Sequence, residues 1–268
     1  MGAVTVASAG ESATTNYGDV AFLPGWGSPV WRDEFDGDLS QWNIRTTGKE
    51  AQDTDGYFAP GMAFIRNGQL VMRTQRTAPV TVAGKVVSYA TTYLDTIGKF
   101  SQRYGRWEIR LKALEPMRSR GIWPAFWLRD DQGGGENDIY EAVGTPCAHP
   151  AYYPNDGSGV SETMYQQTGV KTPGQFSGRT YTLAQPIYDF HTYACEWTPA
   201  GMTNFIDGKV ALQVTAAFIQ QGFTSTANIR LDKFVGTDWA GRPNQTDTAD
   251  IDDMIVDYVR VWKYAPTS

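Results

Sequence analysis

The sequence is poor in metal-binding side chains and in long apolar runs. Its 268 residues include only two histidines, His149 and His191, and two cysteines, Cys147 and Cys195. This supply excludes a three-histidine zinc site and a four-thiolate metal site. No run of about 18 consecutive apolar residues occurs, so we expect no membrane-spanning helix.

An excess of positive charge is also lacking. The chain has 23 Lys and Arg against 29 Asp and Glu, a net charge of −6. Proteins that bind nucleic-acid phosphates present a basic surface, so we expect no nucleic-acid partner. The motifs G-x-S-x-G, G-x-x-x-x-G-K-[ST] and G-x-G-x-x-G are absent as well. Serine-hydrolase, nucleotide-binding and dinucleotide-binding functions therefore lose their usual support.

The N-terminal segment differs in composition from the rest of the chain. Residues 1–18 are mostly small and polar, which predicts a flexible lead-in, and no further composition break divides residues 19–268. The first ten residues have neither the basic region nor the apolar core of a signal peptide. We expect any export signal to be missing or already removed, and residues 19–268 to form one domain that acts as a monomer.

Aromatic and turn-forming residues are abundant, with 9 Trp, 14 Tyr, 12 Phe, 28 Gly and 14 Pro. Polar and apolar residues alternate in segments 70–75, 106–112 and 258–262, which predicts half-buried strands. Segment 204–214 resembles a hairpin whose turn is Asp207-Gly208. The best helix candidate, 215–221, is at most two turns long. These patterns predict an all-β fold.

Three carboxylates lie close together after an aromatic run. Residues 121–128 (GIWPAFWL) and a glycine triplet precede Glu136, Asp138 and Glu141. On a regular strand Glu136 and Asp138 share one face, whereas Glu141 points to the other. A β-bulge between Asp138 and Glu141 adds one residue and restores the shared face. The spacing therefore predicts a bulge and three acids in one cleft.

Two carboxyls facing one cleft, about 5 to 5.5 Å apart, are the parts of a retaining glycosidase. Negative charge on Glu136 and Asp138 disfavours ionisation of Glu141, which predicts Glu136 as nucleophile and Glu141 as general acid and base. Asp138 is expected to support Glu136 by hydrogen bonding. The alternative is a solvated acidic turn after a glycine-rich loop, but the aromatic neighbours favour a sugar-cleaving cleft.

Seven segments resemble motifs of glycoside hydrolase family 16, in order along the chain. They are 33–36 (DEFD), 99–101 (KFS), 104–106 (YGR), 121–127 (GIWPAFW), 136–141 (ENDIYE), 191–198 (HTYACEWT) and 256–262 (VDYVRVW). The resemblance implies a β-jelly-roll sandwich of two curved antiparallel sheets with a concave substrate groove. It also implies retaining hydrolysis of a β-linked polysaccharide. We expect the enzyme to be secreted or located at the cell surface.

The spacing E-x-D-x-x-E resembles the laminarinase, agarase and carrageenase branches of that family. We therefore expect an endo-β-1,3-glucanase. The residues leave three alternatives open: an endo-galactanase, agarase or carrageenase-type hydrolase, a transglycosylase, and a non-catalytic polysaccharide-binding jelly roll.

Aromatic and polar side chains near these motifs are candidates for sugar contacts. Trp123 and Trp127 lie four residues apart on an expected strand, so they share a face and can stack on pyranose rings. For each candidate the alternative is a role in the core. The full set of substrate-binding candidates is Trp123, Trp127, Trp197, His191, Tyr93 and Arg103.

Catalysis by two carboxylates requires no cofactor. The resemblance implies a structural Ca²⁺ site formed by Glu34, Asp257 and the Gly68 carbonyl, whereas the alternative is that these acids cap turns or pair with arginines. Cys147 and Cys195 can form a disulfide if their strands are neighbours, or remain two thiols.

Overall fold

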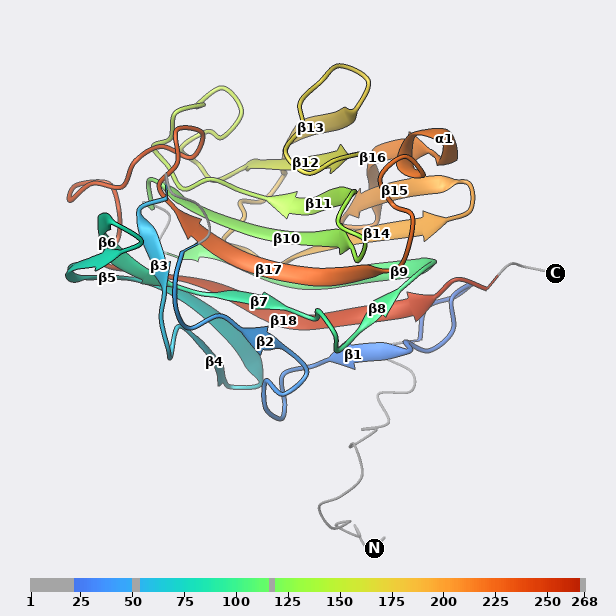
Figure 1. The fold of residues 1–268 in the computed structure, drawn as a ribbon, viewed down its shortest axis with the longest axis horizontal. Helices are drawn as coiled ribbons and strands as arrows, with labels where there is room; N and C mark the ends of the chain where they lie inside the picture. The colour runs from blue at the N-terminus through green and yellow to red at the C-terminus, as the bar shows by residue number, and fades with distance from the viewer. Residues whose placement is uncertain (1–21, 50–53, 116–118, 266–268) are drawn as a thin grey trace, which may run out of the picture.

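The computed structural model describes residues 22–49, 54–115 and 119–265. The lead-in expected at residues 1–18 lies outside this part of the chain. Two curved, mainly antiparallel sheets pack face to face (Figure 1), which confirms the predicted all-β jelly roll. Within the described residues no helix is long and apolar enough to span a membrane.

We call the larger of the two sheets the outer sheet. Its eight-strand path runs from one edge to the other as β16 (Lys209–Thr215), β15 (Gly201–Ile206), β14 (His191–Thr198), β9 (Gly105–Glu115), β18 (Ile251–Lys263), β5 (Gln69–Val82), β6 (Lys85–Thr91) and β3 (Gly56–Phe58). Two short strands join this path, namely β1 (Trp31–Asp33) beside β18 and β4 (Ala63–Arg66) beside β5.

We call the other sheet the groove sheet. Its strands follow the order β13 (Phe176–Thr182), β12 (Gly159–Tyr165), β11 (Glu136–Glu141), β10 (Ile122–Asp130), β17 (Ala227–Val235), β7 (Tyr93–Asp95) and β2 (Asn43–Ile44). The short strand β8 (Ser101–Gln102) pairs with β17. Strands β11 and β10 thus lie in the interior of this sheet, where neighbours on both sides fix their backbones.

The period-two alternation of the sequence determines which side chains enter the core. On β9, Trp107 and Ile109 have no exposed surface and pack between the sheets. The β15–β16 hairpin turns at Asp207 and Gly208, which both have positive φ angles, 47° and 73°, as the predicted two-residue turn requires. The predicted helix is the single turn α1 (Ala216–Ile219), capped by the Thr215 hydroxyl.

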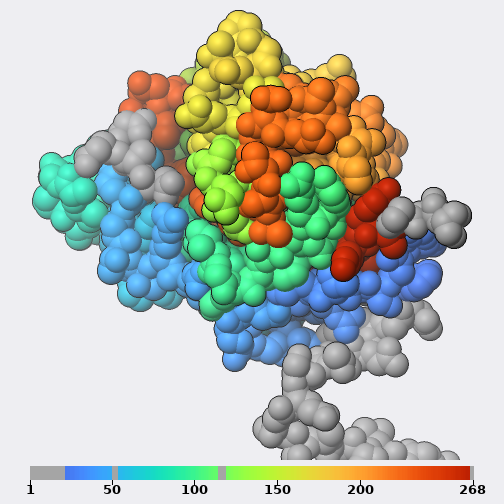
Figure 2. Space-filling view, turned by 45° about the vertical axis from the view of Figure 1, so that its right-hand side comes forward, coloured from blue at the N-terminus to red at the C-terminus, as the bar shows by residue number. Residues whose placement is uncertain are grey.

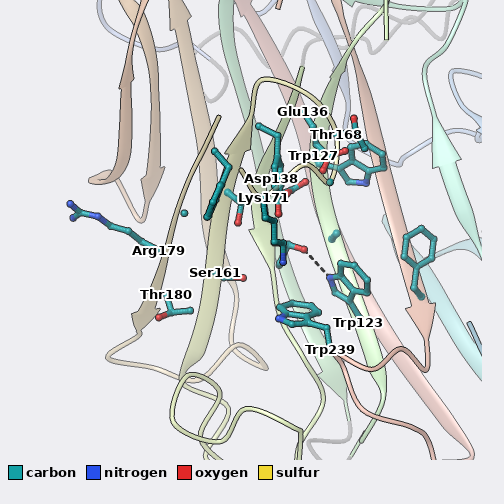
Figure 3. Close-up of a pocket in the computed structure, with 18 of the residues that line it drawn as sticks. Trp123, Trp127, Glu136, Asp138, Ser161, Thr168, Lys171, Arg179, Thr180 and Trp239 are labelled. Carbon is teal, nitrogen blue, oxygen red and sulfur yellow. Dashed lines mark hydrogen bonds between the residues drawn. The ribbon is translucent and has the colours of Figure 1, made fainter. Parts of the chain in front are cut away.

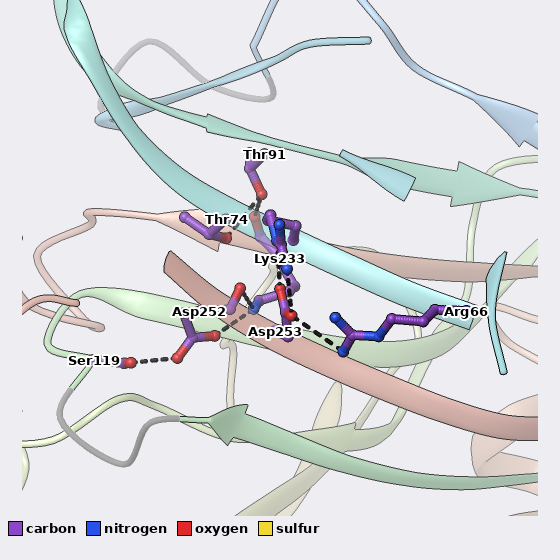
Figure 4. A network of polar contacts seen from close by, with 8 residues as sticks. Arg66, Thr74, Thr91, Ser119, Lys233, Asp252 and Asp253 are labelled. Atoms are coloured by element: carbon purple, nitrogen blue, oxygen red, sulfur yellow. Dashed lines mark hydrogen bonds and ion pairs between the residues drawn. The ribbon is translucent and has the colours of Figure 1, made fainter. Parts of the chain in front are cut away.

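A buried polar network ties the two sheets together at one end (Figure 4). Lys233 of β17 forms an ion pair with Asp252 of β18 and donates to the Asp252 backbone carbonyl at 2.8 Å. The Ser119 hydroxyl donates to the same carboxylate. These contacts anchor β17 to the outer sheet, and they leave the opposite face of β17 to line the groove.

Candidate active site

Strand β11 contains the bulge that brings three acids to one face. Asp138 pairs with Thr163 on β12, and the next pair is Glu141 with Ser161, so two residues of β11 oppose one of β12. The two residues between the acids, Ile139 and Tyr140, both face the core. This confirms the predicted bulge, and Glu136, Asp138 and Glu141 all line one groove.

The groove has a volume of about 830 Å³ and lies across strands β10, β11, β12, β13 and β17 (Figure 3). Trp123, Phe234 and Trp239 form an aromatic wall on one side of the acids. On the other side the β12–β13 hairpin, yellow in Figure 2, projects as a ridge, and Lys171 from its loop lines the groove. An extended ligand can therefore contact aromatic faces and the acids together.

The surroundings of Glu141 favour the protonated form of its carboxyl. Burial first, and the negative charge of Glu136 second, raise its pKa from 4.5 to about 7. The Trp123 indole donates to its carboxyl, with Nε1 3.1 Å from Oε1. The sequence predicted that negative charge nearby raises the pKa of Glu141, and the charge of Glu136 does so. Burial, however, raises this pKa more than the charge does.

Glu136 has cationic neighbours that favour its ionised form. Burial raises its pKa, while the charges of Arg129 and Arg230 act against that rise. Arg129 Nη1 lies 3.3 Å from Glu136 Oε2. This arrangement suits a carboxylate nucleophile.

Asp138 lies between the other two acids on the same strand face. Burial, and then the charges of Glu141 and Glu136, raise its pKa well above its usual range. Three acids in one buried place cannot all ionise, so the arrangement favours one anion and two protonated partners.

Trp123 and Trp127 share the groove face of β10, as their spacing predicts, and both line the groove. Trp127 is held by its indole nitrogen, which donates to Asp232 Oδ2 at 2.6 Å, and by Arg230, whose guanidinium lies 4.7 Å from the ring centre. Tyr93 is fully buried beneath this layer, 6.3 Å from Trp127 between ring centres, and supports the groove rather than lining it.

Three predicted substrate contacts lie away from the groove. Trp197 is in the core between the sheets, where its ring meets Tyr104 at 5.2 Å and almost no surface is exposed. His191 is buried on β14 of the outer sheet with Nδ1 2.7 Å from Asp207 Oδ2. Arg103 donates to the Thr224 carbonyl at 2.7 Å. Trp197 and His191 lie away from the groove because β14 belongs to the outer sheet, and Arg103 is not among the residues that line the groove.

The residues expected to bind calcium are engaged by other side chains. Arg260 forms a two-bond pair with Glu34, both at 2.8 Å, and Arg110 Nη1 lies 2.7 Å from Asp257 Oδ2. Gly68 occupies the turn between β4 and β5. Among residues 22–49, 54–115 and 119–265, no group of three or more His, Cys, Asp or Glu is arranged to hold a metal ion. In the structure these two acids have the arginine partners of the alternative, and binding of Ca²⁺ by this set stays a prediction.

Both cysteines are buried free thiols. Cys195 lies on β14 in the core, whereas Cys147 follows β11 and contacts the Tyr153 carbonyl at 3.7 Å. The sequence leaves open a Cys147–Cys195 disulfide or two free thiols, and the structure has two free thiols.

The sequence pattern did not reveal several residues of the groove. Arg230, Asp232 and Phe234 alternate along β17, and Asp232 and Phe234 line the groove. Period-two alternation in segment 227–235 was the available signal for this face. Ser161 and Lys171 also line the groove, but they occupy a strand and a loop with no motif of their own.

Comparisons with known proteins agree with this geometry. A beta-glucanase of Rhodothermus marinus is 28% identical over 193 residues, which are 66% of this chain and 63% of that protein. A keratan-sulfate endo-1,4-beta-galactosidase of Sphingobacterium multivorum is 27% identical over 252 residues, 87% of this chain and 54% of that protein. The chain thus spans less than two thirds of the length of these relatives.

The crystal structure of the laminarinase catalytic domain from Thermotoga maritima is similar to this chain, with a TM-score of 0.75 and 26% sequence identity over 90% of this chain and 99% of that domain. The family described as glycosyl hydrolases family 16 matches residues 51–259, a range that includes β11 and every groove-lining residue named above. The acids of the bulged strand, the jelly roll and this match agree, and the chain belongs to glycosyl hydrolases family 16.

Proposed function

We propose that this protein is a retaining endo-glycosidase whose first substrate is a β-1,3-linked glucan. The observation that carries the proposal is the groove face of β11, where an arginine-paired Glu136 and a proton-retaining Glu141 flank Asp138. Two carboxyls with different protonation states are what double displacement requires.

In the first step the Glu141 carboxyl donates its proton to the glycosidic oxygen while the Glu136 carboxylate attacks the anomeric carbon. The bond to the leaving sugar breaks, and a glycosyl ester on Glu136 forms. In the second step ionised Glu141 takes a proton from water, the water oxygen attacks the anomeric carbon, and Glu136 is released. Asp138, protonated between them, limits the negative charge beside the nucleophile.

The groove supports binding within a chain rather than only at its end. It crosses five strands, and the half-buried Trp123 presents an aromatic surface of the kind that sugar rings stack on. A polysaccharide is too large to enter a cell intact, so we propose that the enzyme acts outside the cell or at its surface, as a monomer.

A second candidate substrate is an anionic galactan. Lys171 lines the groove, and its charge favours ionisation of Asp138 and Glu141, so its ammonium lies within range of the reacting centre. A cation at that place can pair with a sulfate or carboxylate on a bound sugar. The Sphingobacterium relative, named for keratan sulfate, is consistent with this candidate.

The test is reducing-end release from laminarin, mixed-linkage β-glucan, β-1,3-galactan, agarose, carrageenan and keratan sulfate. Each is incubated with the wild type, with Glu136→Gln, and with Asp189→Asn as a surface carboxylate control. Cleavage of laminarin that only Glu136→Gln abolishes supports the glucanase. Cleavage of a sulfated galactan that Lys171→Met weakens supports the second candidate. Binding without cleavage of any glycan would instead indicate a polysaccharide-binding module.

A further inference from the structure

We propose that Tyr153 and Ser161 form a hydrogen-bond relay that positions the carboxyl of Glu141. This inference rests on the proposed function of Glu141 as general acid and base. Neither residue belongs to the E-x-D-x-x-E motif. Both line the same groove as Glu141, and Tyr153 comes from the loop between β11 and β12.

The bulge of β11 determines which residue of β12 meets Glu141. Beyond the bulge Glu141 is the direct cross-strand partner of Ser161. Directly opposed residues on antiparallel strands have Cβ atoms about 4.5 to 5.5 Å apart on the same face. This pairing places the Ser161 side chain beside Glu141 on the groove face, where donation from the Ser161 hydroxyl favours the ionised form of Glu141.

The direction of the hydrogen bonds follows from the chemistry of hydroxyl groups. Tyr153 donates its phenolic hydrogen to Ser161 Oγ at 2.7 Å. A serine hydroxyl has one hydrogen and two lone pairs. Because Tyr153 occupies a lone pair, the hydrogen of Ser161 is available for Glu141, and the order of donation is Tyr153 to Ser161 to Glu141. Successive hydrogen bonds of this kind strengthen one another.

Glu141 is thus held from both neighbouring strands. Trp123 of β10 donates to Oε1 from one side, and in the proposed relay Ser161 of β12 donates from the other. An indole N–H cannot accept a proton, so the Glu141 oxygen that Trp123 contacts, Oε1, is the acceptor of that bond. The proton of Glu141 is therefore assigned to Oε2, the other carboxyl oxygen.

The start of the relay is fixed by packing. Tyr153 is almost fully buried and meets Trp239 edge-on, with 5.7 Å between ring centres. The loop that carries it lies against the first residue of β12, Gly159, where an added Cβ would be 2.3 Å from the Tyr152 carbonyl oxygen. A rigid Tyr153 can hold Ser161 in one rotamer.

The relay acts on Glu141 together with other charges. The titratable groups that surround this carboxyl from the adjoining strands and loops are Glu136, Asp138, Tyr153, Tyr165 and Lys171. A change confined to hydroxyl groups leaves these charges in place. Ser161→Ala and Tyr153→Phe therefore isolate the hydrogen bonds.

The experiment is a ¹³C NMR titration of the Glu141 carboxyl, assigned by its loss in Glu141→Gln, together with the pH dependence of kcat/KM. We expect a wild-type midpoint near 7. Ser161→Ala should raise it by about one pH unit, and Tyr153→Phe by less, because donors to a carboxylate favour its ionised form. Ser161→Thr should restore the wild-type midpoint, and Thr182→Ala, an exposed hydroxyl deletion on β13, should not move it.

In the active enzyme we expect kcat to fall about tenfold in Ser161→Ala with KM little changed, as befits partial loss of acid–base catalysis. An unmoved midpoint in folded Ser161→Ala would overturn the relay, and if that variant does not fold, an unmoved midpoint in Tyr153→Phe would do so. A wild type that cleaves no polysaccharide refutes the proposed function instead, and the NMR titration still decides the relay.

Discussion

Lys233 of β17 and Asp252 of β18 form an ion pair between the two sheets, and neither side chain has any exposed surface (Figure 4). Strand β17 also presents Asp232 and Phe234 to the groove. The pair therefore joins the floor of the groove to the outer sheet. A buried charge that loses its partner is strongly unfavourable, so the two residues are coupled.

Lys233→Met should destabilise the fold by roughly 3 to 5 kcal/mol, because it leaves the Asp252 carboxylate buried without its cation. In a domain of this size that corresponds to a fall in Tm of roughly 10 °C. Calorimetry at neutral pH measures it. Lys263→Met, at the exposed end of β18, is the matched control and should change Tm little. Equal effects of the two variants would contradict the assigned coupling.

Glu162 is a buried acid that the proposed mechanism does not use. It faces the core from β12, on the side opposite Ser161, beside the Asn204 amide. Burial raises its pKa from 4.5 to about 9. The folded state keeps this proton up to about pH 9, whereas the unfolded state releases it above pH 4.5. The contribution of Glu162 to the free energy of unfolding is therefore greatest below pH 4.5, and it is lost as the pH rises toward 9.

Glu162→Gln should therefore be more stable than the wild type at neutral and alkaline pH, by an amount that grows with pH. Between pH 4.5 and 9 the free energy of unfolding of the variant should gain on that of the wild type by at most roughly 1.4 kcal/mol per pH unit. Urea unfolding at pH 5, 7 and 8.5 measures the difference. Asp189→Asn, an exposed acid, should run parallel to the wild type. A constant difference between Glu162→Gln and wild type would refute a protonated Glu162.

Arg129→Gln should move the acid limb of kcat/KM to higher pH. The Arg129 charge favours ionised Glu136, so its loss raises the pKa of the nucleophile and less of it is ionised at low pH. We expect a shift of roughly half to one pH unit, which Arg129→Lys should largely restore. Arg103→Gln is the control, since Arg103 lies away from the groove. If Arg129→Gln, Arg129→Lys and Arg103→Gln all showed the same acid limb, the Arg129 charge would not control the ionisation of Glu136.

Removal of divalent cations should leave the protein unchanged. Arg260 already occupies both carboxyl oxygens of Glu34, and Gln69 and Arg110 occupy those of Asp257. A bound Ca²⁺ would have to displace these partners, whereas the ion pairs need no metal. The measurement is Tm with EDTA and with excess Ca²⁺. A rise in Tm on adding Ca²⁺ would mean that the cation does bind the folded state.

The bulged strand β11 was predictable because its signals are local. The parity of Glu136, Asp138 and Glu141 required a bulge, and the shared face of Trp123 and Trp127 followed from their spacing. Both features depend on residues within a few positions of one another. The hairpin turn at Asp207 was predictable for the same reason, since two residues determine it.

The rest of the groove depends on pairings between distant segments, which one sequence does not reveal. Asp232 meets Trp127 across 105 positions, and Glu34 meets Arg260 across 226. Alternation showed that Trp197 lies on a strand but not which sheet that strand joins. The effect of burial on Glu141 also needed the fold, because the sequence displays neighbouring charges but not the removal of water.

The separate roles of Glu136 and Glu141 predict opposite products when azide replaces the missing carboxylate. In Glu136→Ala, azide should attack an activated β-glycoside from the face that the nucleophile occupied and give an α-glycosyl azide. In Glu141→Ala the glycosyl ester still forms with an activated leaving group, and azide should displace it from the other face to give a β-glycosyl azide. Without azide, loss of the acid and base should slow natural substrates roughly 10² to 10⁴-fold. The anomeric coupling constant in the proton NMR spectrum identifies each product, and exchanged configurations would reverse the assignment of the two acids.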